Sequence, residues 1–282
     1  MISLLIFGIG LVAGFVDAIA GGGGLIMLPG LLFAGLPVSS AIATNKLCGT
    51  FGAFTSTLKF AHGKQVNWLV SAWMALPVVA GAAIGSQSID RLPAAWAEPL
   101  VILLIVIITA FVVLNPAFGV KKTDRSELTK AKISDEKLSD EKRSDEKNRY
   151  EKNRDSKPPL TQIALSIVAG TAIGFHDGFF GPGTGIFLVF SLLSIWPMDF
   201  LLATGTTKLL NFLTNVTALI TFAISGTIVY SLGFYGAVGV ATGSYLGASF
   251  ATKKGAAFIR PIFVIVTTAL VLKLAAEYVS SL

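Results

Sequence analysis

The stretch that decides the fold lies at residues 14–24 and reads GFVDAIAGGGG. In this stretch a long apolar segment that contains one aspartate comes to its end, and four glycines follow. Residues 174–177 read GFHD, so the motif returns after 160 residues, and the sequence GPGTG at residues 181–185 follows it as the glycines follow the first copy. The chain therefore carries the same interrupted apolar segment twice.

The duplication extends well beyond the glycines. Residues 43–47 (ATNKL) correspond to residues 205–209 (GTTKL) at an offset of 162. The same offset relates three single residues, namely Gly81 to Gly243, Gly85 to Gly247, and Pro99 to Pro261. A nearly constant register over half the chain predicts two copies of one unit, at residues 1–120 and 159–282.

The composition of the two repeats is that of a membrane protein. The 282 residues are 53% apolar and only 13% charged, with a mean hydropathy of +0.73, whereas soluble domains carry about 25% charged residues. Of the 38 charged residues, 23 lie between Lys121 and Lys157, which leaves 15 for the other 245 positions. So few charges cannot keep the surface of a soluble domain hydrated, and the sequence predicts a chain that crosses a membrane several times.

Residues 121–158 join the two repeats and differ from them in composition. Between Lys121 and Lys157 they contain 13 basic and 10 acidic residues, with a near-repeat of five residues (SDEKL, SDEKR, SDEKN). A repeat of five residues does not align apolar side chains along one face of a helix. Such a composition is typical of a solvated, flexible linker.

The number of apolar segments predicts the topology. Each repeat holds three full spans and one pair of shorter segments broken at the glycines, so it crosses the membrane an odd number of times. Two such units in series are inverted relative to each other, and together they form about 8–10 transmembrane segments. With both termini outside, Lys64, the linker and the basic residues at 253, 254 and 260 face the cytoplasm, as the positive-inside rule requires. We therefore expect an all-α bundle of two inverted repeats in the cytoplasmic membrane.

Four charged residues fall inside the apolar segments and are related by the repeat. Asp17 corresponds to Asp177, and Lys46 corresponds to Lys208, while a fifth charge, Lys59, lies near a helix end from which it can reach the interface. A charge at membrane depth costs at least about 2.5–3.5 kcal/mol and therefore needs a partner or a water-filled cavity. For the aspartates two interpretations stay open, namely pairing with the lysines or capping of the broken helices on one side, and proton coupling on the other.

The glycine clusters are not nucleotide-binding loops, because they lack the Gly-Lys-Ser/Thr ending and no strand precedes them. A helix break at membrane depth is the better interpretation, since the short helix after each break then directs free N–H groups at a shared cavity. The residues of interest here are Gly22, Gly23 and Gly183. Close packing of helices through small residues is the alternative.

Each lysine also begins a polar helical face. Lys46, Thr50, Ala53 and Thr57 share one face of the first repeat, and in the second repeat Asn211 and Asn215 follow Lys208 on the equivalent face. Small and polar residues below a lysine suit the wall of a hydrophilic pathway, although hydrogen bonds between helices would give the same pattern. His176, next to Asp177, offers a proton relay but has no counterpart in the first repeat, where Val16 stands.

Taken together, residues 14–24, 43–47 and 205–211 (GTTKLLN) resemble the sulfite exporter TauE/SafE family of membrane permeases. The resemblance covers the chain except the linker at residues 121–157. It implies transport of small sulfur-containing anions, such as sulfite, thiosulfate, sulfoacetate or sulfolactate, across the cytoplasmic membrane.

We therefore expect a secondary transporter, and an exporter, of a small sulfur-containing or organic anion. The residues expected to bind the anion are Lys46, Lys208, Asn45, Thr44, Thr206, Thr207, Asn211, Asn215, Gly22, Gly23 and Gly183. The residues expected to couple protons are Asp17, Asp177 and His176. An anion channel and a carrier for a small carboxylate are the alternatives.

No enzymatic activity, cofactor, metal site or nucleic-acid partner is expected. An enzyme is disfavoured because the sequence offers neither a metal-ligand cluster nor a nucleophile with its base. The partners expected are the small anion and the lipid bilayer, and a homodimer is one assembly left open.

Overall fold

The computed structural model describes residues 2–90 and 158–254, which form eight α-helices. In chain order these helices are α1 (Ile2–Ala20), α2 (Gly24–Phe33), α3 (Val38–His62), α4 (Trp68–Asp90), α8 (Leu160–Phe179), α9 (Thr184–Ile195), α10 (Phe200–Ile224) and α11 (Tyr230–Lys254). The all-α prediction is confirmed for this part of the chain. The charged segment 121–157 and the apolar stretches 99–118 and 258–276 lie outside the described residues, as do the predictions made for them.

Both predicted helix breaks fall at the glycine clusters. α1 ends at Ala20, and Gly21 takes a φ of +72°, a conformation that residues with a side chain rarely adopt. In the second half Gly181 and Gly183 have φ values of +97° and +85°, and α9 begins at the next residue, Thr184. The helices after the breaks have 10 and 12 residues, so neither spans a bilayer core, which needs about 20 residues.

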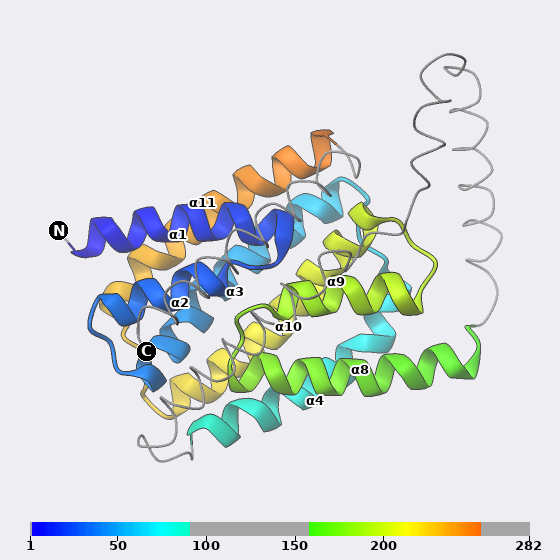
Figure 1. Ribbon diagram of the computed structural model, residues 1–282, viewed down its shortest axis with the longest axis horizontal. Helices are drawn as coiled ribbons and strands as arrows, with labels where there is room; N and C mark the ends of the chain where they lie inside the picture. Colours follow the sequence, from blue (N-terminus) through cyan, green and yellow to red (C-terminus); the bar gives the residue numbers. More distant parts are fainter. Residues whose placement is uncertain (1, 91–157, 255–282) are drawn as a thin grey trace, which may run out of the picture.

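The closest helix pairs join the two halves of the chain. α1 of the first half lies along α11 of the second, and α4 lies along α8 in the same way (Figure 1). A Cβ atom added at Gly81 of α4 would lie 2.6 Å from the backbone nitrogen of Phe175, and one added at Gly243 would lie 2.8 Å from that of Phe15. Since Phe15 and Phe175 are themselves 160 residues apart, the glycine landmarks of the sequence mark two equivalent close helix contacts.

Three of the described helices are long and apolar enough to cross a membrane, namely α1, α4 (over Trp68–Ile89) and α10. The helices α3, α8 and α11 are comparably long, with 25, 20 and 25 residues, but are more polar in composition. In α3 the polar residues point inward, where Asn45, Lys46 and Ser56 are buried. Outward-facing side chains such as Leu4 and Leu76 are by contrast apolar and exposed, as lipid contact requires.

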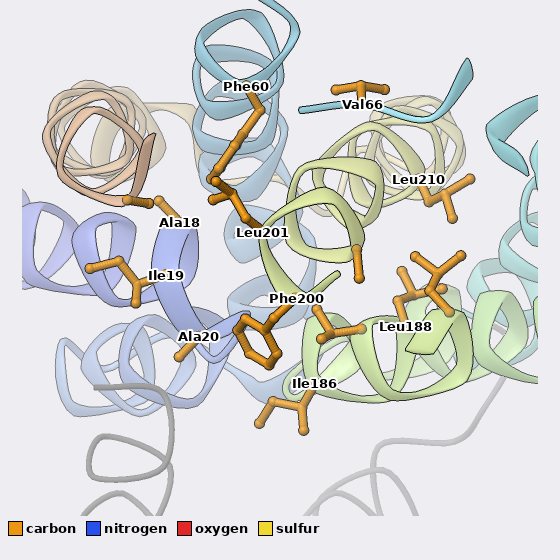
Figure 2. Close-up of a cluster of buried hydrophobic side chains, with 14 of the residues drawn as sticks. Ala18, Ile19, Ala20, Phe60, Val66, Ile186, Leu188, Phe200, Leu201 and Leu210 are labelled. Carbon is orange, nitrogen blue, oxygen red and sulfur yellow. The ribbon is translucent and has the colours of Figure 1, made fainter. Parts of the chain in front are cut away.

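The hydrophobic core also joins the two halves. Figure 2 shows a buried cluster that includes Ile19 of α1, Phe60 of α3, Ile186 of α9 and Leu201 of α10. The helix ends on either side of the glycine breaks therefore pack against one another. This packing fixes the position of the polar residues that lie next to the breaks.

Candidate functional site

Two ion pairs connect the halves at the centre of the bundle. Lys46 Nζ on α3 lies 2.8 Å from Asp177 Oδ1 on α8, and Lys208 Nζ on α10 lies 2.9 Å from Asp17 Oδ2 on α1. Lys208 Nζ also donates to the backbone carbonyl of Asp17. Each lysine therefore pairs with the aspartate of the other repeat, which is the pairing that the sequence had left as one alternative. The pairs bring together the four charges that the repeat relates.

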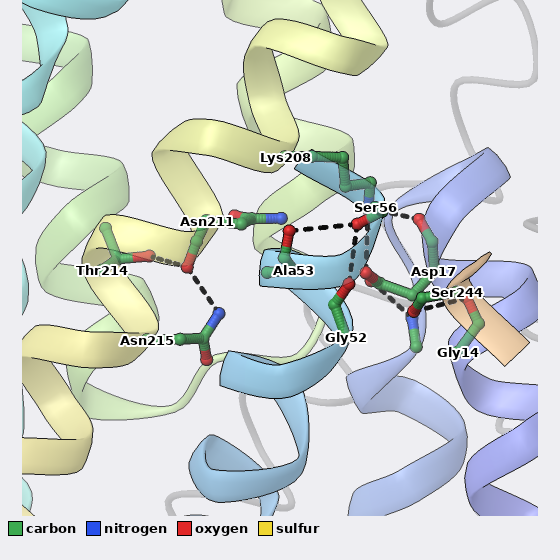
Figure 3. A network of polar contacts seen from close by, with 11 residues as sticks. Gly14, Asp17, Gly52, Ala53, Ser56, Lys208, Asn211, Thr214, Asn215 and Ser244 are labelled. Atoms are coloured by element: carbon green, nitrogen blue, oxygen red, sulfur yellow. Dashed lines mark hydrogen bonds and ion pairs between the residues drawn. The ribbon is translucent and has the colours of Figure 1, made fainter. Parts of the chain in front are cut away.

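The helices hold these charges in equivalent places. Each aspartate lies in the last turn of its helix, directly before a glycine break, and each lysine lies eight residues after the start of α3 or α10. Figure 3 shows Lys208 reaching from α10 to Asp17, with Asn211 and Asn215 further along α10. The backbone nitrogen of Gly23 donates to Asp17 Oδ1 over 3.2 Å, so Asp17 also caps the start of α2.

The two glycine breaks meet each other beside the ion pairs. A Cβ atom added at Gly21 would lie 2.7 Å from Cα of Gly185, and one added at Gly181 would lie 2.7 Å from Lys46 Nζ. Only glycine allows the backbone of one break to approach the other, and allows the lysine to approach the second break.

A cavity of about 50 Å³ lies between the breaks and the helices α3 and α10. Seven of the residues predicted for the site line it, namely Asn45, Lys46, Asn211, Asn215, Gly23, Asp17 and Asp177. They come from both halves of the chain. The cavity therefore combines one ammonium, three amides and two carboxylates at the centre of the molecule.

The remaining predicted residues lie outside the cavity wall, and their role in binding stays a prediction. Lys208 is fully buried beneath Asp17. The hydroxyl of Thr44 accepts from the backbone nitrogen of Val229, and that of Thr206 accepts from the nitrogen of Asn67, both over 3.0 Å. Donor and acceptor of the two bonds are both related by the offset of 162, so the two threonines stabilise equivalent loops.

Four other predicted residues contribute locally. The carbonyl of Gly22 accepts from Leu25 in the first turn of α2, and Gly183 supplies the left-handed turn before α9. The buried hydroxyl of Thr207 has no hydrogen-bond partner among the described residues. His176 Nδ1 lies 3.2 Å from the hydroxyl of Thr184, and His176 is not among the residues that line the cavity.

The sequence analysis missed several residues of the cavity wall. Gly49 lies three residues after Lys46 on the same helical face, a spacing that was available to the analysis. Met27 and Val240 also line the cavity, but isolated apolar residues in a membrane helix carry no sequence signal of such a role. In the described residues no group of three or more His, Cys, Asp or Glu side chains is arranged to hold a metal ion.

Comparisons with known proteins agree with this architecture. The model of the sulfite exporter TauE/SafE family matches residues 6–274. A probable membrane transporter protein, ORF9, of Sinorhizobium sp is 32% identical over 266 residues, which cover 94% of this chain and 89% of the relative. A probable membrane transporter protein of Haemophilus influenzae is 31% identical, and the match covers 93% of this chain and 90% of the relative. The probable membrane transporter protein YfcA of Escherichia coli K12 is 29% identical, and the match covers 96% of this chain and 88% of the relative. No solved structure matches the chain significantly. The match over nearly the whole chain shows that this protein belongs to the sulfite exporter TauE/SafE family of membrane transporters.

Proposed function

We propose that this membrane transporter is a secondary carrier that exports a small sulfur-containing anion, such as sulfite, thiosulfate or a sulfonate, or a small organic anion. The observation that carries the proposal is the central cavity, in which Lys46 lies with Asn45, Asn211 and Asn215. An ammonium group and amide N–H groups are suitable donors for the oxygens of an oxyanion. The burial of Lys46 strengthens this attraction, because the effective dielectric constant there is nearer about 20 than about 80.

The size of the cavity supports a small substrate. One water molecule needs about 10–15 Å³ of such space, so a cavity of about 50 Å³ has room for only a few waters. An anion with a handful of non-hydrogen atoms fits this space without large rearrangement.

The helix directions support two inverted repeats as the basis of alternating access. The equivalent helices α3 and α10 run antiparallel, since the Phe54 and Phe212 rings lie 5.4 Å apart while the end of α3 approaches Gly205 at the start of α10. A two-fold axis that relates antiparallel helices is perpendicular to them and therefore lies in the membrane plane. Rocking of one repeat against the other around the central site would then open the site to each side in turn.

Charge balance supports ion coupling. The two lysines and the two aspartates neutralise one another, so an anion that binds beside Lys46 competes with Asp177 for the same ammonium. Neutralisation of a carboxylate by a proton removes this competition. Asp17, Asp177 and His176 are the candidate groups for this role.

The ends of the helices support the proposed orientation in the cell membrane. A Cβ atom added at Gly63 would lie 3.4 Å from the side chain of Thr252, so Lys64 and Lys253 lie at the same end of the bundle. α8 begins at that end as well, because it runs parallel to α4, and residues 121–157 precede it. α1 runs parallel to α11 and therefore begins at the opposite end. We propose that the basic end is cytoplasmic and that both termini are outside.

Transport by the purified full-length protein in liposomes tests the proposal. We expect saturable uptake of labelled sulfite or thiosulfate and counterflow when unlabelled anion is present inside. Single-channel conductance without counterflow would instead identify an anion channel. Uptake of acetate or lactate without any uptake of sulfur oxyanions would identify a carboxylate carrier.

A further inference from the structure

The two repeat-related aspartates differ in how their oxygens are used. Both carboxylate oxygens of Asp17 accept a hydrogen bond, Oδ1 from Gly23 and Oδ2 from Lys208. The side chain of Asp17 is 21% exposed. Asp177 accepts from Lys46 on Oδ1, whereas its Oδ2 is buried and has no hydrogen-bond partner in residues 2–90 and 158–254. The side chain of Asp177 is only 3% exposed.

This difference decides where a proton can bind at little cost. Both oxygens of Asp17 already accept a hydrogen bond, so a proton there would compete with a donor that is already present. A proton on Oδ2 of Asp177 displaces none, and it removes a negative charge that is buried with a single donor, an arrangement that is energetically unfavourable.

A proton also fits the space better than a metal cation. Oδ2 of Asp177 has essentially no surface open to a water-sized sphere, so a sodium ion beside it would need the surrounding helices to move. A proton needs no such room. The geometry therefore favours a proton site over a sodium site.

On the basis of the proposed anion transport, we infer that the coupled proton binds Oδ2 of Asp177. The ammonium group of Lys46 then loses its negatively charged partner and becomes available to the anion, while the ion pair of Asp17 and Lys208 stays intact. Before binding, the pair of Lys46 and Asp177 is neutral. The proton from solution leaves a net charge of +1 on the pair, and one negative charge of the anion neutralises it again. The inference thus separates two pairs that the sequence makes equivalent.

Few other titratable groups act on Asp177. Lys46 of α3 faces it, His176 precedes it on α8, and Asp17 of α1 shares its cavity. Three of the described helices pack against α8. Of these, α9 contains no titratable residue, and the single titratable residue of α4 is Asp90 at its end. The single titratable residue of α10 is Lys208, which is paired with Asp17.

Anion binding at two pH values tests the inference, with thiosulfate as the probe because its charge stays constant in mildly alkaline and mildly acidic buffer. We expect the parent protein to bind about tenfold or more tightly in the acidic buffer, because Lys46 gains a charge-assisted contact there. Asp177→Asn, which keeps the size and the acceptor but lacks the charge, should bind tightly and equally in both buffers. Asp17→Asn, which removes the charge of the repeat-related aspartate, tests the other candidate proton site and should retain the pH dependence.

Proton uptake provides a measurement that needs no variant at position 177. In weakly buffered detergent solution with a pH dye, the parent and Asp17→Asn should take up about one proton per bound thiosulfate. Loss of the pH dependence in Asp17→Asn, or its persistence in folded Asp177→Asn, would overturn the inference. If the parent binds thiosulfate equally in both buffers without proton uptake, the inference fails but the proposed anion site stands. If the parent binds none of the anions in either buffer, the proposed function fails and the inference with it.

Discussion

At the scale of single residues, the centre of the molecule depends on charges that are held in pairs. Lys46 and Lys208 are almost completely buried, and each is compatible with this depth only because an aspartate of the other repeat lies within 3 Å. The two pairs are equivalent in sequence, yet only Lys46 lines the cavity, whereas Lys208 is enclosed under Asp17. Two lysines that are equivalent in sequence therefore differ in their access to the cavity.

This inequality predicts separate effects for the two lysines. Lys46→Met should weaken binding of thiosulfate by about 10- to 150-fold, because one charge-assisted contact of about 1.5–3 kcal/mol is lost. Lys208→Met should change the affinity less than about threefold but lower the free energy of unfolding by about 1.5–3 kcal/mol, since Asp17 loses its partner. Calorimetric titration and thermal unfolding measure the two effects. Lys59→Met, which removes a contact with the ring of Tyr245 outside the cavity lining, serves as the control. Equal losses of affinity in both variants would contradict the assignment.

The threonines before the lysines give a second prediction. Thr44→Val and Thr206→Val each remove the acceptor of a loop N–H group, and each should cost about 1–2 kcal/mol of unfolding free energy, by similar amounts in the two repeats. The hydroxyl of Thr55 donates to the carbonyl of Phe51 in its own helix, so Thr55→Val should have little effect on thermal unfolding. A large loss of anion affinity in either variant, with unchanged stability, would instead make these threonines ligands.

At the scale of the helices, the glycine breaks bring two short helices and two ion pairs to one point. The breaks touch through their backbones, and this contact leaves no room for a side chain at Gly21 or Gly185. Relative motion of the two repeats at this point would therefore change a contact between two backbones. This contact makes the breaks sensitive to the smallest added group.

Gly21→Ala should accordingly abolish transport while Gly226→Ala leaves it largely intact. Both glycines have a similar φ, +72° and +70°, so both substitutions carry the same backbone strain of about 1–2 kcal/mol. Only at Gly21 would the new methyl group meet the backbone of Gly185, whereas at Gly226 no atom lies within 4 Å. Liposome uptake, corrected for the amount of folded protein by size-exclusion chromatography, compares the two variants. Equal transport by both would show that the contact between the breaks is not needed.

These elements also show how far the sequence alone predicts this protein. Four consecutive glycines and charges inside apolar segments are rare, so the helix breaks and the burial of Lys46 beside them could be predicted from residue type. Which lysine meets which aspartate depends on which helices of the two repeats are neighbours, and no local pattern contains that information. The sequence predicts Thr44 and Thr206 as ligands because they precede the lysines, and that role stays a prediction. Their hydrogen bonds to loops that are distant in sequence could not be predicted from any local pattern.

At the scale of the whole molecule, the main helix contacts and the two ion pairs of the described residues have counterparts in the other half. α1 with α11 corresponds to α8 with α4, and Lys46 with Asp177 corresponds to Lys208 with Asp17. Such reciprocal contacts are typical of two-fold symmetry. In a carrier with inverted repeats, the same sequence can then form both the open and the closed side by exchanging the conformations of its halves.

The orientation proposed for the bundle gives the last prediction. Lys253 lies at the end of α11, whereas Ser225 lies just before its start, so the two positions are at opposite ends of the bundle, and both are exposed. In a variant whose buried Cys48 is replaced by alanine, Ser225→Cys should react with a membrane-impermeant maleimide in intact cells, because we expect that end to face outward. Lys253→Cys should react only after the cells are permeabilised, which also shows that the thiol is accessible. Labelling of Lys253→Cys but not of Ser225→Cys in intact cells would reverse the orientation. Labelling of both in intact cells would mean that α11 does not cross the membrane, and the arrangement of inverted repeats would then be wrong.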